Sequence, residues 1–372
     1  MNTAKRLPRI FFAIYLLAAI SAVLYVCFLL FAPFADWFNQ SISAFGRATL
    51  AYASNLIPFS LAEMVLILIP LWFVLLILLA KRYTASLHDA LVYLGILFGI
   101  ICLVLILFVW NFAPGYYGTT LDKKLEIDRT KVTADELYAT SLLLSDELGD
   151  LAEQISFLPS GESVMPYSHS EMNQKLLAAY ERFSESNAFI QTFSSSVKSV
   201  MLSHPMSYTH ITGVYTFFTG EANLNINFPD YTLPYTAAHE LAHQRGIARE
   251  DEANFVAFLV CMESEDVYIR YSALLNLYEY VVSALYSADY TLYFKSYGTL
   301  PQSIRDERVA YGKFFDRYRE NVAAEISQTT NNLYLQSQGN KEGTKSYGMV
   351  VDLAVAYYRP QISQSTVLPQ GA

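Results

Sequence analysis

Long uncharged apolar runs dominate the first third of the chain. Residues 10–35 contain no charged side chain, and two further apolar segments cover about residues 61–80 and 90–113. About 20 apolar residues of helix span the hydrocarbon core of a bilayer, whereas the apolar part of a cleavable signal peptide has only about 7 to 15. The pattern therefore predicts a membrane domain, residues 1–117, with three transmembrane helices.

Beyond residue 118 the apolar residues alternate with polar ones. Residues 133–155, and the chain from Pro234 almost to its end, repeat apolar residues at the spacing of helices that bury one face. Residues 208–228 differ, because they are rich in Thr, Tyr, Phe, Val and Ile and contain Gly213 and Gly220, which predicts a strand or hairpin. The sequence thus predicts a mainly α protein, in which a mostly helical α+β domain of residues 118–372 follows the membrane helices.

Composition and charge divide the chain in the same way. The 372 residues are 53% hydrophobic and carry a net charge of -9. Residues 1–112 hold six Lys or Arg and three Asp or Glu, whereas the remaining 260 residues hold 19 and 31. A domain this acidic is repelled by phosphate backbones. We therefore expect no nucleic acid as a partner, and we expect the lipid bilayer to surround the apolar helices.

The basic residues of the short loops predict the orientation in the membrane. Such residues accumulate on the cytoplasmic side. Five of the six basic residues precede the first span or separate the second from the third, namely Lys5, Arg6, Arg9, Lys81 and Arg82. The remaining loop has only Arg47. We therefore expect a multi-pass protein of the cell membrane with a cytoplasmic N-terminus and an extracytoplasmic C-terminal domain.

A motif with the spacing of a zinc site follows the predicted sheet. Residues 233–246 read Leu-Pro-Tyr-Thr-Ala-Ala-His-Glu-Leu-Ala-His-Gln-Arg-Gly. On a helix, His239 and His243 lie one turn apart and project from the same face, at a separation that one zinc ion can bridge. Glu240 would flank the zinc-bound water and take its proton as a general base. The predicted cofactor is Zn²⁺.

The residues around this motif favour a helix of the required length. Pro234 suits the first turn, and Gly246 can adopt the left-handed conformation that ends a helix. A simpler interpretation is a helix whose two histidines are satisfied surface or core residues. Histidine is scarce in this chain, with six in 372 residues, and this favours the metal site.

A catalytic zinc site needs a third protein ligand and one open position. The order of residues resembles the gluzincin class of zinc peptidases, in which a Glu on a later helix is the third ligand and an Asp four residues further supports a ligand histidine. Glu250 and Asn254 have this spacing, although Asn replaces Asp. Glu252 is the alternative third ligand, and the helix dipole alone also favours acids at a helix start. The third histidine of the metzincin pattern is absent, because Arg249 stands in its place.

Four runs of sequence make the chain similar to a known family. Thr219–Asn223, Leu233–Gly246 and Arg249–Phe255, together with Ser346–Leu353, resemble bacterial membrane proteins that are grouped as a domain of unknown function. That family combines transmembrane helices with an HExxH core of the zincin superfamily. The resemblance implies a bacterial envelope protein with a zincin-like fold and supplies no substrate.

The resemblance also suggests where a substrate would bind. Zincins usually take a peptide as an added strand along a sheet edge beside the metal helix. We expect residues 214–225 to form this edge, with Glu221, Asn223 and Asn225 either as substrate contacts or as a solvated strand face. A stabiliser of the oxyanion is not evident, since no histidine follows His243. A tyrosine, or His204 or His210, would have to serve.

Two functions fit these observations. The first is a membrane-anchored zinc metallopeptidase that hydrolyses a peptide or protein substrate on the extracytoplasmic side. The second is a non-catalytic sensor or scaffold that a zinc ion stabilises. Glu240 favours the enzyme, because a purely structural zinc site is closed by four ligands and has no use for a general base.

Overall fold

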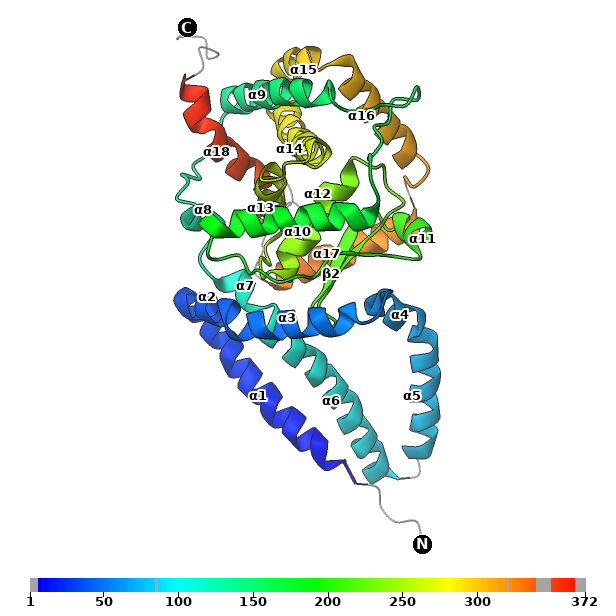
Figure 1. Cartoon of the computed structure of the whole chain (residues 1–372). Helices are drawn as coiled ribbons and strands as arrows, with labels where there is room; N and C mark the ends of the chain where they lie inside the picture. The colour runs from blue at the N-terminus through cyan, green and yellow to red at the C-terminus, as the bar shows by residue number, and fades with distance from the viewer. Residues whose placement is uncertain (1–5, 84–85, 320, 339–348, 365–372) are drawn as a thin grey trace. The chain divides into compact units, whose positions relative to one another are not determined.

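The chain folds into two compact units. The computed structural model describes residues 1–372 except 1–5, 84–85, 320, 339–348 and 365–372 (Figure 1). The first unit comprises Met1–Thr119 together with Thr216–Glu221, and the second comprises Thr120–Tyr215 and Ala222–Ala372. A short segment from the middle of the sequence thus belongs with the N-terminal unit, which no sequence pattern indicated.

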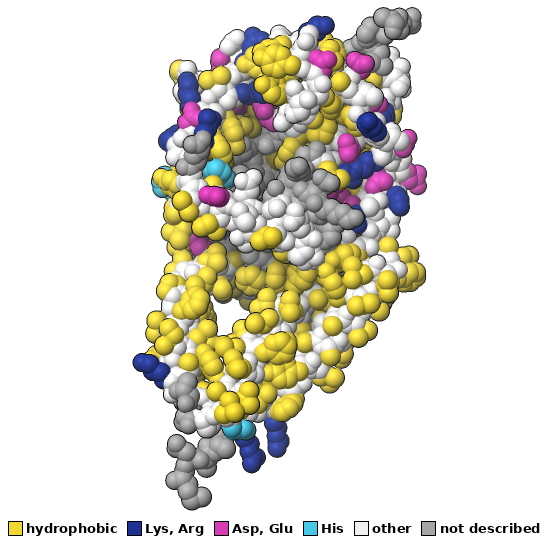
Figure 2. Space-filling view, turned by 180° about the vertical axis from the view of Figure 1, so that it is seen from behind, with side chains coloured by type: hydrophobic (Ala, Val, Ile, Leu, Met, Phe, Trp, Pro, Cys, Tyr) yellow, Lys and Arg dark blue, Asp and Glu magenta, His cyan; other side chains and the backbone are white. Residues whose placement is uncertain are grey.

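Apolar helices that are long enough to cross a bilayer lie in the first unit. α1 (Arg9–Leu30) and α6 (Leu87–Asn111) meet this criterion, and they pack against each other. α4 (Leu61–Ile67) and α5 (Ile69–Tyr83) meet it only as a pair bent by 55°. Figure 2 shows the apolar surface of these helices, with Lys and Arg at one end. Among the described residues there are thus two candidate spans, or three if the bent pair counts as one.

Two prolines explain why the helices of this unit differ from the uninterrupted spans that the sequence predicts. The first span ends at Leu30 rather than near residue 35, because a new helix, α2 (Ala32–Gln40), starts with Pro33 in its first turn. Pro70 follows the break between α4 and α5, where its missing N–H cannot continue the preceding helix.

The segment between the first and second predicted spans is also helical. It contains the end of α2 and all of α3 (Ile42–Asn55). Arg47 of α3 is fully buried and donates to the side chain and carbonyl of Asn39 and to the carbonyl of Asn111, each at 2.8 Å. These bonds tie α2, α3 and the end of α6 together. A short helix, α7 (Pro114–Tyr117), then closes the unit.

The second unit is mostly helical, as predicted. The first long helix, α9 (Ala134–Ala152), begins at a capping box formed by Thr133 and Glu136, which confirms the predicted helix start. The other helices, except for two that carry the metal-site motif, are α8 (Leu121–Lys124), α10 (His169–Ser186), α11 (Ser203–Ser207), α14 (Val267–Ala288), α15 (Tyr290–Thr299), α16 (Gln302–Phe315), α17 (Val322–Ser337) and α18 (Val350–Gln364). Of the run Ser346–Leu353, residues 346–348 lie outside the described residues.

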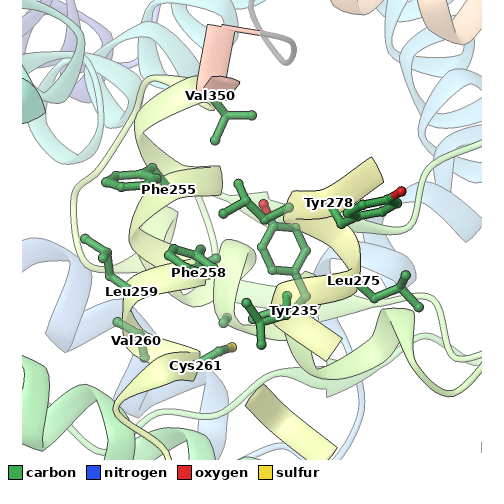
Figure 3. Close-up of a cluster of buried hydrophobic side chains, with 14 of the residues drawn as sticks. Tyr235, Phe255, Phe258, Leu259, Val260, Cys261, Leu275, Tyr278 and Val350 are labelled. Carbon is green, nitrogen blue, oxygen red and sulfur yellow. The ribbon is translucent and has the colours of Figure 1, made fainter. Parts of the chain in front are cut away.

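The core of this unit forms around two consecutive buried helices, α12 (Thr232–Gln244) and α13 (Glu250–Met262). Figure 3 shows side chains of α13, among them Phe255 and Phe258, packed with Tyr235 of α12, with residues of α14 and with Val350 of α18. α12 also contacts α10 and α14. Because neighbours surround it, α12 holds its side chains in fixed positions.

A small three-stranded sheet precedes α12, as the sequence predicts. The strands are β1 (Lys198–Ser199), β2 (Gly213–Thr216) and β3 (Glu221–Leu224), in the spatial order β1-β3-β2. β1 and β3 are parallel, with Lys198 opposite Asn223. Only β2 therefore forms the free edge on its side of the sheet, whereas the expectation treated residues 214–225 as one edge. The difference arises because β1 has two residues and leaves no pattern in the sequence.

Candidate metal centre

Hydrogen bonds from neighbouring helices fix α12 in place. The Tyr180 hydroxyl of α10 donates to the carbonyl of Ala238 at 2.6 Å, and the Tyr235 hydroxyl donates to the carbonyl of Asn254 in α13 at 3.0 Å. The backbone N–H of Tyr235 donates to the Ser272 hydroxyl of α14 at 3.1 Å. Every residue of α12 is buried. The motif on this helix is therefore part of the core.

The end of α12 orients one histidine of the motif. Gly246 has φ 95°, and its N–H donates to the carbonyl of His243 at 3.0 Å, while the N–H of Ile247 donates to the carbonyl of Ala242 at 3.1 Å. This is a Schellman motif, and it confirms the left-handed glycine cap. The carbonyl of Ile247 then accepts a hydrogen bond from Nδ1 of His243 at 2.7 Å. In neutral His243 the proton therefore sits on Nδ1, and Nε2 keeps a lone pair for a metal.

Three potential ligand atoms converge beside α12. Nε2 of His239 and Nε2 of His243 are 3.0 Å apart, and each lies 3.3 Å from Oε2 of Glu250. A tetrahedral zinc with bonds of about 2.0 to 2.2 Å sets its ligand atoms about 3.3 to 3.6 Å apart. Oε2 of Glu250 is buried and, among the described residues, makes no hydrogen bond of good geometry beyond its 3.3 Å ion-pair contacts with the two imidazoles. The two 3.3 Å sides of the triangle match this spacing, and the 3.0 Å side between the histidines need widen only slightly for the group to hold a zinc ion, which would stabilise the converging lone pairs.

The two acids that follow Glu250 point elsewhere. Oε1 of Glu252 accepts hydrogen bonds from the backbone N–H of Leu121 at 3.0 Å and from Arg249 at 3.1 Å. Asp251 pairs with Arg129 at 2.9 Å. Of the two predicted third ligands, Glu250 is thus the one that the structure brings to the histidines, and Glu252 serves contacts within the protein.

Asn254 lies four residues after Glu250, one turn along α13, and interacts with His239. This interaction favours the protonated imidazole of His239. Nδ1 of His239 and Nδ2 of Asn254 are both buried without a hydrogen-bond partner of good geometry in the described part of the chain. The Asn254 amide, with its oxygen turned toward His239, would accept from Nδ1–H and leave Nε2 for a metal. Asn254 is thus placed to support His239, one of the candidate ligands.

The predicted general base, Glu240, lies against strand β2. A Cβ atom added to Gly213 would come within 2.6 Å of Oε1 of Glu240, so only glycine permits this approach of the strand. The backbone N–H of Tyr215 donates to the Glu240 carboxylate. Oε2 of Glu240 is buried without a partner among the residues described. One oxygen of Glu240 is thus held by the protein, and the other remains available.

Burial and mutual charge shift the pKa values of this group of residues. Burial raises the pKa of Glu240 to about 8. Burial also raises the energy of a charged His243, but the charge and hydrogen bond of Glu250 outweigh this and raise the pKa of His243 to about 9. Burial opposes ionisation of Glu250 too, yet the two histidines hold its pKa well below the usual range. Burial and the charge of His243 lower the pKa of His239.

The three residues expected along the substrate strand are bonded within the protein. Glu221 accepts hydrogen bonds from the backbone N–H groups of Leu61 and Ala62. Asn223 donates to the carbonyl of Val214, and Asn225 donates to Ser207 Oγ and to the carbonyl of Ile211, so that all three side chains are buried. The bond of Asn223 joins the two strands of the hairpin, whereas the bonds of Glu221 and Asn225 join it to other segments. The alternative of a solvated strand face was wrong, and the role toward a substrate stays a prediction.

The residues considered for oxyanion stabilisation are distributed over the second unit. His204 interacts with the Tyr318 hydroxyl at 3.1 Å, and His210 interacts with the Tyr318 carbonyl at 2.7 Å. Tyr280 of α14 lies close to the candidate ligands, since its hydroxyl interacts with the charge of Glu250 and with the side chain of Asn254. Burial is the chief cause of the raised pKa of Tyr280. The sequence alone did not single out Tyr280 among 28 tyrosines.

Sequence reasoning also missed the role of β2. Gly213 and Tyr215 contact the predicted general base, although the sequence indicated functional side chains further along, at Glu221, Asn223 and Asn225. An isolated glycine in a strand often marks a close backbone approach, and Gly213 carried this signal. Only the folded structure shows that the neighbour of Gly213 is Glu240.

Comparison with known proteins identifies one family that covers most of the chain. No curated protein and no solved structure matches the chain. The model of one family, described as "Protein of unknown function (DUF3810)", matches residues 38–355 and so covers helices of both units, the sheet and the complete candidate metal centre. This chain belongs to that family of unknown function.

Proposed function

We propose that the protein is a membrane-anchored, zinc-dependent metallopeptidase with a zincin-like domain. The observation that supports it most is the convergence of His239, His243 and Glu250 within 3.3 Å of one another, with the carboxylate of Glu240 on the same helix. Three ligands leave one position open at zinc, as catalytic sites require. Zinc held there would supply a Lewis acid that polarises a water molecule and a peptide carbonyl.

The chain's own residues would move the proton. Oε2 of Glu240 is the free oxygen of the carboxylate, so it would take a proton from the attacking water and return it to the leaving nitrogen. In the closed arrangement the N–H of Tyr215 holds the other side of the carboxylate in place. In the metal-free site burial raises the pKa of Glu240 to about 8. The charge of a bound zinc ion would lower it toward neutral pH, where a carboxylate can both accept and donate a proton.

The orientation of β2 supports a peptide as the substrate. The carbonyl of Val214 accepts from Asn223 of β3, and the N–H of Tyr215 belongs to the same peptide plane and points the opposite way, to Glu240. The outer edge of β2 therefore faces the proposed general base. A peptide that pairs with this edge would carry its carbonyl groups along the site.

The position in the cell is part of the proposal. The apolar helices of the first unit indicate association with a membrane. The basic residues of the short loops favour a cytoplasmic N-terminus and an extracytoplasmic site. The substrate would then be a peptide or protein outside the cytoplasmic membrane.

Two observations favour a second function, a zinc-stabilised sensor or scaffold. Glu240 is only 4% exposed and His243 only 6%, so that the site is closed to a large substrate in this arrangement. The Asn at position 254, in place of Asp, points the same way, because supporting partners are worth about 10 to 100-fold in metal affinity or activity.

The test is metal analysis and peptide cleavage with the full-length protein in detergent. We expect one zinc per chain, and we expect zinc to be lost from both His239→Ala and His243→Ala. Cleavage of a peptide library by wild type, and its loss in Glu240→Gln with zinc retained, would support the enzyme. Equal inactivity of both proteins with stoichiometric zinc would instead establish the scaffold.

A further inference from the structure

The β2–β3 hairpin contains both the strand that contacts Glu240 and a segment that belongs to the first unit. Gly213 and Tyr215 contact Glu240 within the second unit. The next residues, Thr216–Glu221, belong to the first unit. These six residues are here called the hairpin tip. No flexible linker separates the residue that contacts Glu240 from the hairpin tip, because Tyr215 and Thr216 are consecutive and their Cα atoms are about 3.8 Å apart.

The hairpin tip is anchored by a carboxylate. Oε1 of Glu221 accepts from the N–H of Leu61 at 3.0 Å, and Oε2 accepts from the N–H of Ala62 at 2.9 Å. These are the first two residues of α4, whose N–H groups have no partner within the helix. Glu221 is 2% exposed, and hydrogen bonds from a helix start to a buried carboxylate are among the stronger ones.

Two further contacts fix the tip without polar groups. Gly220 has φ 71°, and a Cβ atom there would lie 2.6 Å from Cβ of Leu50 and 2.8 Å from the backbone nitrogen of Ala51, both in α3. The ring of Phe217 makes an edge-to-face contact with Phe108 of α6, with centroids 5.3 Å apart. The tip thus contacts three helices of the first unit.

The hairpin itself has little freedom to absorb a displacement of its tip. The N–H of Gly220 donates to the carbonyl of Thr216 at 2.8 Å, which closes the turn. The side chain of Asn223 donates to the carbonyl of Val214 at 3.1 Å, in the peptide unit whose N–H holds Glu240. A shift of the tip would therefore move this peptide unit.

We propose that the β2–β3 hairpin is a regulatory link through which the helices of the first unit control access to the metal centre. With the tip anchored, β2 stays on Glu240 and the centre is closed. A rearrangement of α3, α4 or α6 that releases the tip lifts β2 from Glu240 and opens the centre to a peptide. The inference rests on the proposed function and names the regulation of that same site.

Two tip variants, each with a matched control, test this link in the full-length protein loaded with zinc in detergent. Glu221→Gln turns an amide NH₂ toward one of the two N–H groups of α4, and Glu153→Gln removes the same charge from an exposed position. Gly220→Ala places a methyl group against α3, whereas Gly298→Ala adds one where no atom lies within 4 Å. The two measurements are amide hydrogen exchange over β2 and the rate at which a chelator removes zinc.

The expected result is a coupled effect. Both tip variants should raise exchange at the amides of Leu61 and Ala62, and also at residues 213–216, by roughly tenfold or more, as expected for loss of hydrogen bonds to a charged group. Zinc removal should accelerate in the same variants, and both controls should match wild type. Should Gly220→Ala fail to fold, Glu221→Gln still gives the comparison.

One result would overturn the link. If Glu221→Gln raises exchange at Leu61 and Ala62 but leaves residues 213–216 and zinc removal as in wild type, the tip has been released without moving β2. A wild-type protein that binds no zinc would refute the proposed function instead. The comparison of amide exchange between wild type and the tip variants would then test the regulatory link alone, because it depends on neither bound metal nor activity.

Discussion

Replacing Glu240 by Gln separates the chemical role of this residue from the cost of burying it. Gln has nearly the same shape and can accept the hydrogen bond from the N–H of Tyr215, but it cannot take a proton from water. The substitution therefore leaves the fold and the three ligand side chains in place. Its effects on stability and on turnover have different causes and are measured separately.

The effect on stability follows from the raised pKa in the metal-free protein. Burial raises the pKa of Glu240 from 4.5 to about 8. Below pH 4.5 both folded and unfolded chains hold the proton, so the carboxyl group costs nothing. Between pH 4.5 and 8 the unfolded chain ionises while the folded chain stays protonated, and stability falls as the pH rises. At pH 7 this cost is about 3 kcal/mol. Metal-free Glu240→Gln should be more stable than wild type by about that amount.

The effect on turnover applies to the zinc-loaded protein. General-base catalysis is typically worth about 10² to 10⁴-fold, which corresponds to about 3 to 5 kcal/mol in the barrier. Glu240→Gln should lose turnover within this range and keep its zinc, since the substituted group is not a ligand.

The assay is urea unfolding of the full-length chain in detergent and chelator, followed by near-ultraviolet circular dichroism of its 28 tyrosines. Wild type, Glu240→Gln and the exposed control Glu153→Gln are compared at pH 4.5 and pH 7. Glu240→Gln should be stabilised at pH 7 and nearly unchanged at pH 4.5, with the control unchanged at both. Equal unfolding midpoints for Glu240→Gln and wild type at pH 7 would refute the raised pKa, and unchanged turnover would refute the role as base.

Three further outcomes are expected. Glu250→Ala should lose zinc and Glu252→Ala should retain it, as measured by metal analysis; the reverse would place the third ligand two residues later. Gly246→Ala forces a side chain into a left-handed conformation and should lower the free energy of unfolding by about 1 to 2 kcal/mol. The control Gly298→Ala in helix α15 should not lower it. Equal unfolding midpoints for Gly246→Ala and wild type would argue against the Schellman motif. A reporter that is active only outside the cytoplasm should be active when fused after residue 118 and silent after Tyr83; the opposite pattern would place the metal centre in the cytoplasm.

Local sequence signals predicted the helix of the candidate metal centre because its features lie within about one turn of each other. His239 and His243 are separated by one turn, and Gly246 adopts the left-handed conformation that its position suggested. The choice between Glu250 and Glu252 could not be made in this way. Both acids lie in the first turn of α13, and the partners that engage Glu252 include Leu121, far away in the sequence.

The boundaries of the apolar helices were harder to predict for a related reason. Hydropathy measures how apolar a segment is, and it does not show where the chain bends. The 26 uncharged residues from Ile10 to Ala35 read as one span, but a new helix begins after Leu30. Residues 61–80 also read as one span, and the break before Pro70 turns the axis by 55°. A proline within an apolar run was the available sign of such a bend.

The bend between α4 and α5 has a consequence for the bilayer around the protein. α5 has 15 residues and is about 22 Å long, which is shorter than the hydrocarbon core of about 30 Å. If the pair crosses as one span, α4 must supply the remaining length along an axis inclined by 55°. A thicker bilayer would favour a straighter pair and a thinner one a sharper bend, because hydrophobic mismatch costs a fraction of a kcal/mol for each Å. The first turn of α4, where Glu221 is bound, would move with that angle, so that membrane thickness would change the position of this binding point.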